Sequence, residues 1–431
     1  KNGFIMNIII NPCKSKWDSL TQRPYTENNS VVDSVKEIFK NVQKNGDKSL
    51  IDYSLKFDNV KIDKLKVSEN LINDSEFKIS SNLKKAIDLA YNNIYKFHSS
   101  QLQKKNIIEV QKGINCWQEK RPINNVGLYI PGGSAPLFST VLMLGIPSLI
   151  ANCSNRILCT PPNFKNEIAP EILYACKICG ISNIFKVGGA QAIAAMTFGT
   201  ESIPKIDKIF GPGNQYVTEA KKYSMNYGLS IDMPAGPSEL LVLADDSANP
   251  KYVASDLLSQ AEHGIDSQVI LVSNSKALID KVSKEIKIQK EDLSRKEIIT
   301  KSLENSKSIL FDSIDDSIDF INEYAPEHYI INTSNEEYCI SKLSNAGSVF
   351  IGNYTPESAG DYASGTNHTL PTNGYAKQYS GVNTDSFLKT ISFQKISKSG
   401  LMSISNAIET MALSEGLDAH KQAVSIRINE N

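Results

Sequence analysis

Apolar residues in the first quarter of the chain recur every three to four positions. In the stretch SVKEIFKNVQKNG, residues 34–46, the valines, the isoleucine and the phenylalanine fall on one helical face, and the final glycine is a stop signal. This spacing predicts mainly helical structure over residues 30–105.

From about residue 125 the pattern changes to short β-branched runs, each followed by a turn rich in glycine or proline. The first set is NVGLYIPGG, NRILCTPPN, ISNIFKVGG and DKIFGPGNQ, and the second is SELLVLADD, SQVILVSN, KSILF, HYIIN and GSVFIGN. With helical stretches between runs, this alternation predicts parallel sheets joined by crossover helices, and hence two α/β units. Helical spacing returns over residues 398–431, and the two sets share no detectable repeat.

The charge balance of the chain serves only to exclude some classes of binding partner. The chain has 46 basic and 47 acidic residues, a net charge of −1 and no block of like charges, which indicates neither nucleic-acid nor membrane-surface binding. The longest apolar run, residues 139–153, is broken by Gly145 and Pro147 and is shorter than the ~18 residues that span a bilayer. No small-residue cleavage site follows the apolar N-terminus, so we expect a cytoplasmic protein with a small-molecule partner.

Seven cysteines are scattered along the chain, and an odd number without regular spacing indicates reduced thiols. Cys176 and Cys179 have the spacing of a redox or zinc knuckle, but no second pair completes four ligands, so packing is the favoured interpretation. Cys116 and Cys153 invite comparison with the nucleophile of thiol-dependent aldehyde oxidation. Neither stands beside a histidine or a helix start, which argues against that role.

Three glycine-rich turns, YIPGGSAP, KVGGAQA and FGPGNQ, lie at the carboxyl ends of predicted strands, where open parallel sheets bind ligands. They could hold the pyrophosphate of a dinucleotide. None matches the GxGxxG fingerprint, so purely structural turns explain them equally well.

The five histidines give a sharper signal. In DLLSQAEHGIDSQ, residues 256–268, a helix that starts at Asn249-Pro250 and stops at Gly264 places Gln260 and His263 on one face of its last turn. A histidine there could simply complement the helix dipole. Three others also lie near acidic residues in loops or at element ends: His328 after Glu327, His368 in a turn-rich stretch that opens at Asp361, and His420 in SEGLDAHK.

Histidines and carboxylates on a glycine-rich α/β scaffold are ligands that zinc and similar divalent ions use. No local spacing such as HExxH is present. The residues therefore leave a metal-assisted hydrolase and a dehydrogenase both open. His98, in the helical NIYKFHSSQ, lacks acidic neighbours and is interpreted as structural.

Eight long motifs in register indicate a known family. They are VGLYIPGGSAPLFSTVLM (126–143), VGGAQAIAA (187–195), FGPGNQYVTEAK (210–221), IDMPAGPSELLVLAD (231–245), LLSQAEHG (257–264), YAPEHY (324–329), GDYASGTNHTLPT (360–372) and EGLDAHK (415–421). From about residue 20 to 428 the chain resembles the histidinol dehydrogenase family.

The resemblance implies an activity and a set of site residues. The activity is oxidation of L-histidinol to L-histidine through L-histidinaldehyde, the last step of histidine biosynthesis, with two NAD+ reduced and one zinc ion per site. The implied residues are Gln260, His263, Asp361 and His420 as zinc ligands that also meet the substrate, Glu327 and His328 as the acid–base pair, Ser238, His368 and Glu415 as substrate contacts, and Tyr129, Gln191 and Asn214 as NAD contacts. It also implies a homodimer in which Glu415 and His420 complete the partner's site.

The chemistry suits these residue types. A neutral His328 can take the hydroxyl proton near pH 7 while hydride leaves, and a carboxylate such as Glu327 can activate the water that the second oxidation consumes. A catalytically idle α/β regulator and a zinc hydrolase are the alternatives, and neither would reduce NAD+ in a histidinol-dependent way.

For the fold, pattern and resemblance together predict two incomplete Rossmann-like parallel-sheet domains with helical N- and C-terminal extensions. The expected boundaries are an N-terminal extension over 1–24, a discontinuous first α/β domain over 25–128 plus 237–382, an inserted α/β domain over 129–236, and a C-terminal helical tail over 383–431.

Overall fold

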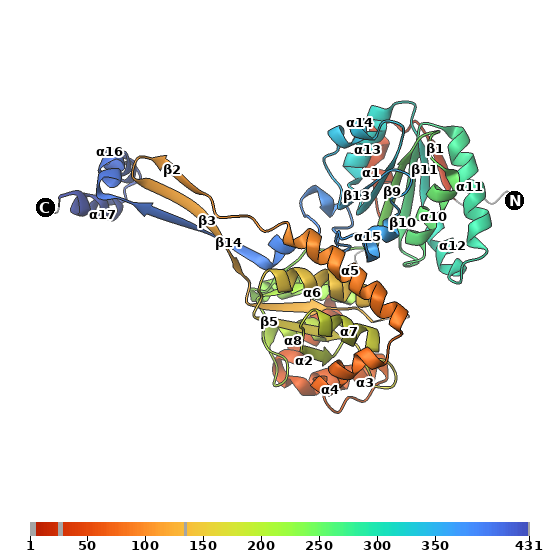
Figure 1. Cartoon of the computed structure of the whole chain (residues 1–431), viewed down its shortest axis with the longest axis horizontal. Helices are drawn as coiled ribbons and strands as arrows, with labels where there is room; N and C mark the ends of the chain where they lie inside the picture. The colour runs from red at the N-terminus through yellow and green to blue at the C-terminus, as the bar shows by residue number, and fades with distance from the viewer. Residues whose placement is uncertain (1–5, 25–28, 133–135, 430–431) are drawn as a thin grey trace.

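A computed structural model describes residues 6–24, 29–132 and 136–429. Two lobes, each built on a parallel sheet with helices on both faces, lie side by side, and a narrow arm projects from them (Figure 1). Part of the first predicted glycine-rich turn, residues 133–135, lies outside the described residues. None of the helices in the described ranges has the length and apolar character needed to cross a bilayer.

The first lobe contains a five-stranded parallel sheet in the order β6-β5-β4-β7-β8. Its strands are β4 (Asn125–Tyr129), β5 (Asn155–Thr160), β6 (Asn183–Lys186), β7 (Lys208–Phe210) and β8 (Ser230–Ile231). The crossover helices are α6 (Phe138–Ile150), α7 (Pro170–Ile178), α8 (Gly189–Phe198) and α9 (Gln215–Ser224). Because helices cover both faces, the strands are apolar on both sides rather than alternating.

The N-terminal helices α2 (Asn29–Asn45), α3 (Asp47–Asp58), α4 (Glu69–Asp74) and α5 (Ser81–Ser99) pack on this same lobe. The apolar face of α2, which includes Phe39, joins one core with α8 and α9, and α5 packs on α6. The expected grouping of residues 25–128 with 237–382 is therefore wrong for this helical segment. The apolar face predicted from spacing exists, but the inserted sheet is what buries it.

The second lobe contains a six-stranded parallel sheet in the order β1-β11-β10-β9-β12-β13. Its strands are β1 (Asn7–Ile10), β9 (Glu239–Ala244), β10 (Gln268–Ser273), β11 (Lys307–Leu310), β12 (His328–Asn332) and β13 (Ser348–Ile351). Its helices are α1 (Trp17–Leu20), α10 (Pro250–Ala261), α11 (Lys276–Lys290), α12 (Lys296–Glu304), α13 (Ile314–Tyr324), α14 (Glu336–Lys342) and α15 (Glu357–Tyr362). Residues 7–10 pair with β11, so part of the expected N-terminal extension is an edge strand of this sheet.

The two sheets share one topology. Numbered from the first strand of each unit, both β6-β5-β4-β7-β8 and β11-β10-β9-β12-β13 have the order 3-2-1-4-5, which is the Rossmann order without its sixth strand. The prediction of two incomplete Rossmann-like units is confirmed. The repeat is one of topology and left no trace in the sequence pattern.

The arm is a three-stranded antiparallel sheet that ends in two helices (Figure 1). It comprises β2 (Ile107–Gln111), β3 (Ile114–Pro122), β14 (Leu388–Ile396), α16 (Lys398–Ser414) and α17 (Asp418–Asn429). The predicted C-terminal helices are present in the described part of 398–431, but a nine-residue strand precedes them. Short 3-10 helices complete the chain: η1 (Lys14–Lys16), η2 (Ser75–Phe77), η3 (Met225–Tyr227), η4 (Tyr375–Lys377) and η5 (Thr384–Phe387).

Candidate active site

A cavity of about 520 Å³ lies between the two lobes. The first lobe contributes residues 211–214, which follow β7, and the second contributes residues that precede its strands, such as Ser238 before β9 and Glu327 before β12. The carboxyl edge of one sheet therefore faces the amino edge of the other. His263 and His368 also line this cavity, so, with Asn214, five predicted site residues meet there.

The α10 helix carries Gln260, and His263 follows its end. The Asn249 side chain caps the start of α10 by accepting from the N–H of Lys251 at 3.0 Å, as the Asn-Pro signal predicts. Gln260 is fully buried. With its amide nitrogen directed at Glu357 and its oxygen accepting from the N–H of Glu239 at 2.9 Å, the amide satisfies both neighbours.

The backbone of one residue of β9, Glu239, positions the predicted acid–base pair. The N–H of Glu239 donates to Oε2 of Glu327 at 2.8 Å, and Nδ1 of His328 lies 3.2 Å from the Glu239 carbonyl oxygen. Both side chains are buried because β12 pairs directly with β9 in the middle of the sheet.

The side chain of the same residue, Glu239, forms a buried ion pair. Arg23 donates through Nε and Nη2 to the Glu239 carboxylate at 3.0 and 2.9 Å, and its guanidinium stacks 3.6 Å from the ring centroid of Tyr324. Sequence analysis did not single out Arg23 or Glu239. Their lone charges carry no spacing signal, and the contact spans more than two hundred residues of chain.

Three carboxylates surround His328. Its Nε2 lies 3.4 Å from Asp361, and its Nδ1 lies 3.6 Å from Glu327 and 3.7 Å from Glu357. Burial alone would lower the pKa of His328, but the negative charges of Glu357, Glu327 and Asp361 outweigh it and hold the pKa well above its usual value.

Glu357 is a site residue that sequence analysis missed. Ligand atoms of His328, Glu357 and Asp361 lie within 4.8 Å of one another, close enough to hold a metal ion. Glu357 and Asp361 are four residues apart on α15 and so share one helical face. That i, i+4 pair of carboxylates was the available signal.

The two histidines that line the cavity, His263 and His368, have lowered pKa values, mainly because burial disfavours the charged ring. His368 is fixed by contacts from Nδ1 to the Asp361 carbonyl oxygen at 2.9 Å and from Nε2 to Thr140 Oγ1 at 3.1 Å. Asp361 opposes the effect of burial on His263 through its negative charge. Uncharged imidazoles beside a carboxylate are a suitable donor set for a borderline divalent ion.

Glu415 and His420 are not brought to this cavity. Both are exposed at the far end of the arm, next to and within α17, whereas α10 and α15 belong to the second lobe (Figure 1). Of the four zinc ligands implied by the resemblance, the chain gathers Gln260, His263 and Asp361 in its own second lobe.

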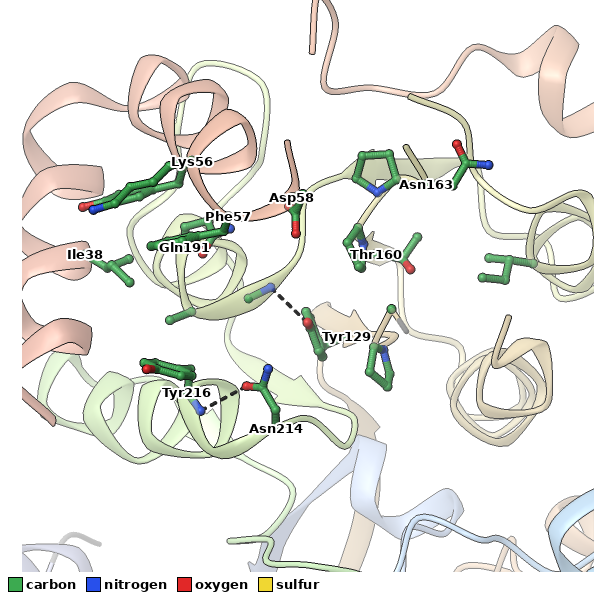
Figure 2. Close-up of a pocket in the computed structure, with 18 of the residues that line it drawn as sticks. Ile38, Lys56, Phe57, Asp58, Tyr129, Thr160, Asn163, Gln191, Asn214 and Tyr216 are labelled. Carbon is green, nitrogen blue, oxygen red and sulfur yellow. Dashed lines mark hydrogen bonds between the residues drawn. The ribbon is translucent and has the colours of Figure 1, made fainter. Parts of the chain in front are cut away.

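A second, larger cavity of about 830 Å³ lies at the carboxyl edge of the first sheet (Figure 2). Tyr129, Gln191 and Asn214, the predicted NAD contacts, all line it. The Tyr129 hydroxyl accepts from the N–H of Gly189 at 3.0 Å, and Asn214 caps α9 by accepting from the N–H of Tyr216 at 3.0 Å. Asn214 lines both cavities and so links them.

Other sequence-based interpretations concern residues outside the cavities. His98 is fully buried, with Nδ1 2.9 Å from the Ile94 carbonyl oxygen, which agrees with a structural role. Cys176 and Cys179 are buried in the first lobe, and burial raises the pKa of both thiols. Among the described residues no cysteine lines either cavity.

Fold and cavities together define a two-lobed α/β protein of the doubly wound class, with a buried cluster of histidines and carboxylates between its lobes. The family model described as histidinol dehydrogenase matches residues 21–428. The chain therefore belongs to the histidinol dehydrogenase family, a family of oxidoreductases.

Individual relatives agree with this assignment. The chain is 53% identical over 425 residues to a histidinol dehydrogenase of Bacteroides thetaiotaomicron, covering 99% of both chains. It is 48% identical over 420 residues to one of Vibrio parahaemolyticus, covering 97% of this chain and 96% of the relative. A crystal structure of histidinol dehydrogenase from Elizabethkingia anophelis matches with a TM-score of 0.97 at 53% identity, covering 99% of both chains. The family resemblance seen in the sequence is confirmed.

Proposed function

We propose that the chain oxidises L-histidinol to L-histidine through L-histidinaldehyde, reducing two NAD+ per substrate. The observation that carries the proposal is the meeting of Ser238, His263, Glu327 and His368 in one cavity that shares Asn214 with a second cavity. A small substrate in the first would face a dinucleotide in the second.

The donor set fits one zinc ion. Gln260, His263 and Asp361 offer an amide oxygen, an imidazole and a carboxylate, and Glu357 fixes the amide of Gln260 by accepting from its nitrogen. When bound, zinc would hold the amine and imidazole of the substrate, and NAD+ would accept the hydride of each oxidation. The Asp361 carboxylate lies 3.4 Å from Nε2 of His328, and its pKa is also influenced by the charge of His263.

In the first oxidation His328 would take the hydroxyl proton, because a zinc ion held by Asp361 would oppose the carboxylate charges that raise the His328 pKa and so favour the neutral ring. Its Nδ1 donates to the Glu239 carbonyl oxygen, which leaves Nε2 as the atom that faces the substrate proton. In the second oxidation Glu327 would activate the water that attacks the aldehyde. Only one of its oxygens is held by the Glu239 N–H, and burial raises the pKa of its carboxyl group, which makes the carboxylate a stronger base toward water.

The arm supports a shared site in a homodimer. His420 and Glu415 are too far along the arm to reach their own chain's cavity, so we propose that each completes the site of a second copy. The arm carries exposed apolar side chains that a partner would bury, including Ile107, Val110 and Met411. Isologous pairing would then produce two equivalent sites. The seven free thiols suit a reducing compartment, so we place the protein in the cytoplasm.

Absorbance of reduced nicotinamide tests the reaction. Two NADH should form per histidinol consumed, chelation should abolish the signal, and added Zn2+ should restore it. Full activity in stoichiometrically metal-free protein would refute the metal role, and NAD+-independent turnover would indicate a hydrolase instead.

A mixed dimer tests the shared site. Chains carrying His263→Asn and chains carrying His420→Asn are each expected to be inactive as homodimers. If His420 acts across the interface, a purified mixed dimer has one intact site and should recover about half of the parent activity. A folded mixed dimer without activity would show that the arm serves its own subunit.

A further inference from the structure

Two residues at one side of the larger cavity have oxygen atoms without hydrogen-bond partners. Within the described ranges, Oδ2 of Asp58 and Oγ1 of Thr160 are shielded from solvent and contact no donor or acceptor. Both residues line the same cavity as Tyr129 and Gln191 (Figure 2). Thr160 is almost completely buried, so its hydroxyl has no access to solvent in compensation.

Such atoms are unfavourable unless a ligand satisfies them. Burial raises the pKa of Asp58 because it disfavours the charged carboxylate. Asp58 is also the last residue of α3, where the negative end of the helix dipole disfavours a carboxylate. A ligand hydroxyl group that donates to Oδ2 would remove the penalty of leaving this oxygen buried and unpaired. The site therefore favours a ligand that carries hydroxyl donors.

Topology indicates which part of a dinucleotide would supply them. In doubly wound folds an acidic residue near the end of the second strand accepts from the 2′-hydroxyl of the adenosine ribose. The second strand here is β5, and it ends at Thr160 rather than at an acidic residue. Asp58, from an N-terminal helix that packs on this lobe, supplies the carboxylate that the strand lacks.

The link between the cavities sets the direction of the dinucleotide. Asn214 lines both cavities, so the reactive nicotinamide has to lie at that end, next to the substrate residues. Asp58 and Thr160 line the larger cavity alone. They are therefore placed for the distal, adenosine half.

We propose that Asp58 accepts a hydrogen bond from the adenosine 2′-hydroxyl, with Thr160 in the same subsite, and that it thereby selects NAD+ over NADP+. This rests on the proposed NAD-dependent function. A 2′-phosphate would offer no donor to Oδ2 and would bring negative charge against a carboxylate. Other charged residues of the lining reinforce the discrimination, because Glu37 and Glu167 outnumber Lys56.

The test compares Asp58→Asn and Asp58→Ala with the parent in two assays. The first follows the binding of NADH and of NADPH by fluorescence. The second measures histidinol oxidation with NAD+ or with 2′-deoxy-NAD+. Loss of a hydrogen bond to a charged group should weaken NADH binding about tenfold or more, while NADPH binding should strengthen. At saturating NAD+, kcat should change little, because Asp58 is remote from the reacting atoms. Asp52→Asn is the matched control, since Asp52 is exposed on the same helix and does not line the cavity.

The deciding result is how the reaction changes when NAD+ is replaced by 2′-deoxy-NAD+, which lacks the 2′-hydroxyl. The parent should prefer NAD+ to 2′-deoxy-NAD+ by about tenfold, and Asp58→Ala should show almost no preference. The proposal is overturned if the folded Asp58 variants keep the parent preference for NADH over NADPH, or keep the parent response to 2′-deoxy-NAD+. The binding arm does not need histidinol turnover. A parent protein that binds NADH but never oxidises histidinol would therefore refute the proposed function and leave the Asp58 assignment to stand or fall separately.

Discussion

The ion pair between Arg23 and Glu239 can be perturbed without touching the proposed reacting groups. The two side chains are 6% and 0% exposed, and the Glu239 carboxylate also accepts from the N–H of Asn373. Arg23→Met removes the cation and keeps much of the alkyl volume. Glu239→Gln removes the negative charge and keeps an oxygen for Asn373. The double variant removes both charges at once.

The expected magnitudes follow from burial. Breaking a buried ion pair by removing one partner is destabilising by about 3–5 kcal/mol, because the other charge stays buried and unpaired. Each single variant should therefore lower the free energy of unfolding of the second lobe by about 4 kcal/mol. In the double variant no charge is stranded, and the main loss is the stacking of Arg23 on Tyr324, worth about 2 kcal/mol when desolvated. The double variant should thus be more stable than either single variant.

Trp17 provides the assay, because it is buried in the second lobe in edge-to-face contact with Phe311 and Phe320. The chain has two tryptophans, so a Trp117→Phe background isolates its fluorescence. Urea unfolding then reports on this lobe. Lys377→Met, which breaks an ion pair whose side chains are 41% and 48% exposed, is the control and should change stability by less than about 1 kcal/mol. A double variant as unstable as the sum of the two single variants would refute the stranded-charge argument.

Three further outcomes are expected. Glu327→Gln should slow oxidation of supplied histidinaldehyde more than the first oxidation, because only the second consumes water, whereas His328→Asn should impair both; parent-rate aldehyde oxidation by the Glu327 variant would reverse the roles. Replacing Cys116 and Cys153 by Ala should leave aldehyde oxidation intact in folded protein, and selective loss of that step would revive a thiol mechanism. Burial lowers the pKa of His98 below its value in the unfolded chain. The contribution of the buried neutral ring to the free energy of unfolding is therefore complete above about pH 6.5 and is lost as the pH falls toward the lowered pKa. His98→Gln should therefore flatten the decrease in urea stability between pH 7 and pH 5, and an unchanged slope would contradict this.

The sequence predicted the elements of the fold better than their grouping. The hydrophobic pattern and the turn residues located both strand sets, because each strand is short, apolar and bounded by glycine or proline. They could not assign α2 to a lobe, since an apolar helical face does not specify which sheet will cover it. The strand β14 was missed because it lies on an exposed arm, where its partner β3 and not a buried core determines its conformation.

For the candidate site, sequence analysis found the residues with unusual chemistry and missed those that hold them. Gln260 and His263 were visible as a pair on one helical turn. Glu239 was not, because its role depends on a peptide that meets β12 across the sheet. The rule that parallel sheets bind ligands at the carboxyl ends of their strands also does not locate the histidine and carboxylate cluster, which lies at the amino edge of the second sheet. At the opposite edge Asp245 accepts from the N–H groups of Ser247 and Ser334.

The strand pairings also determine the order in which the chain can be completed during synthesis. The strand β1 is translated long before its neighbour, because it pairs Asn7 with Lys307, so at ~5–20 residues per second it waits roughly 15–60 s for that neighbour. The strands and helices of the first lobe are finished well before that. In the arm, β3 must likewise wait for β14, the pairing partner of Ile114 being Ile396. The helices α16 and α17 of the arm leave the ribosome after both lobes have been translated. This timing shortens the period in which their exposed apolar side chains can meet other unfolded chains.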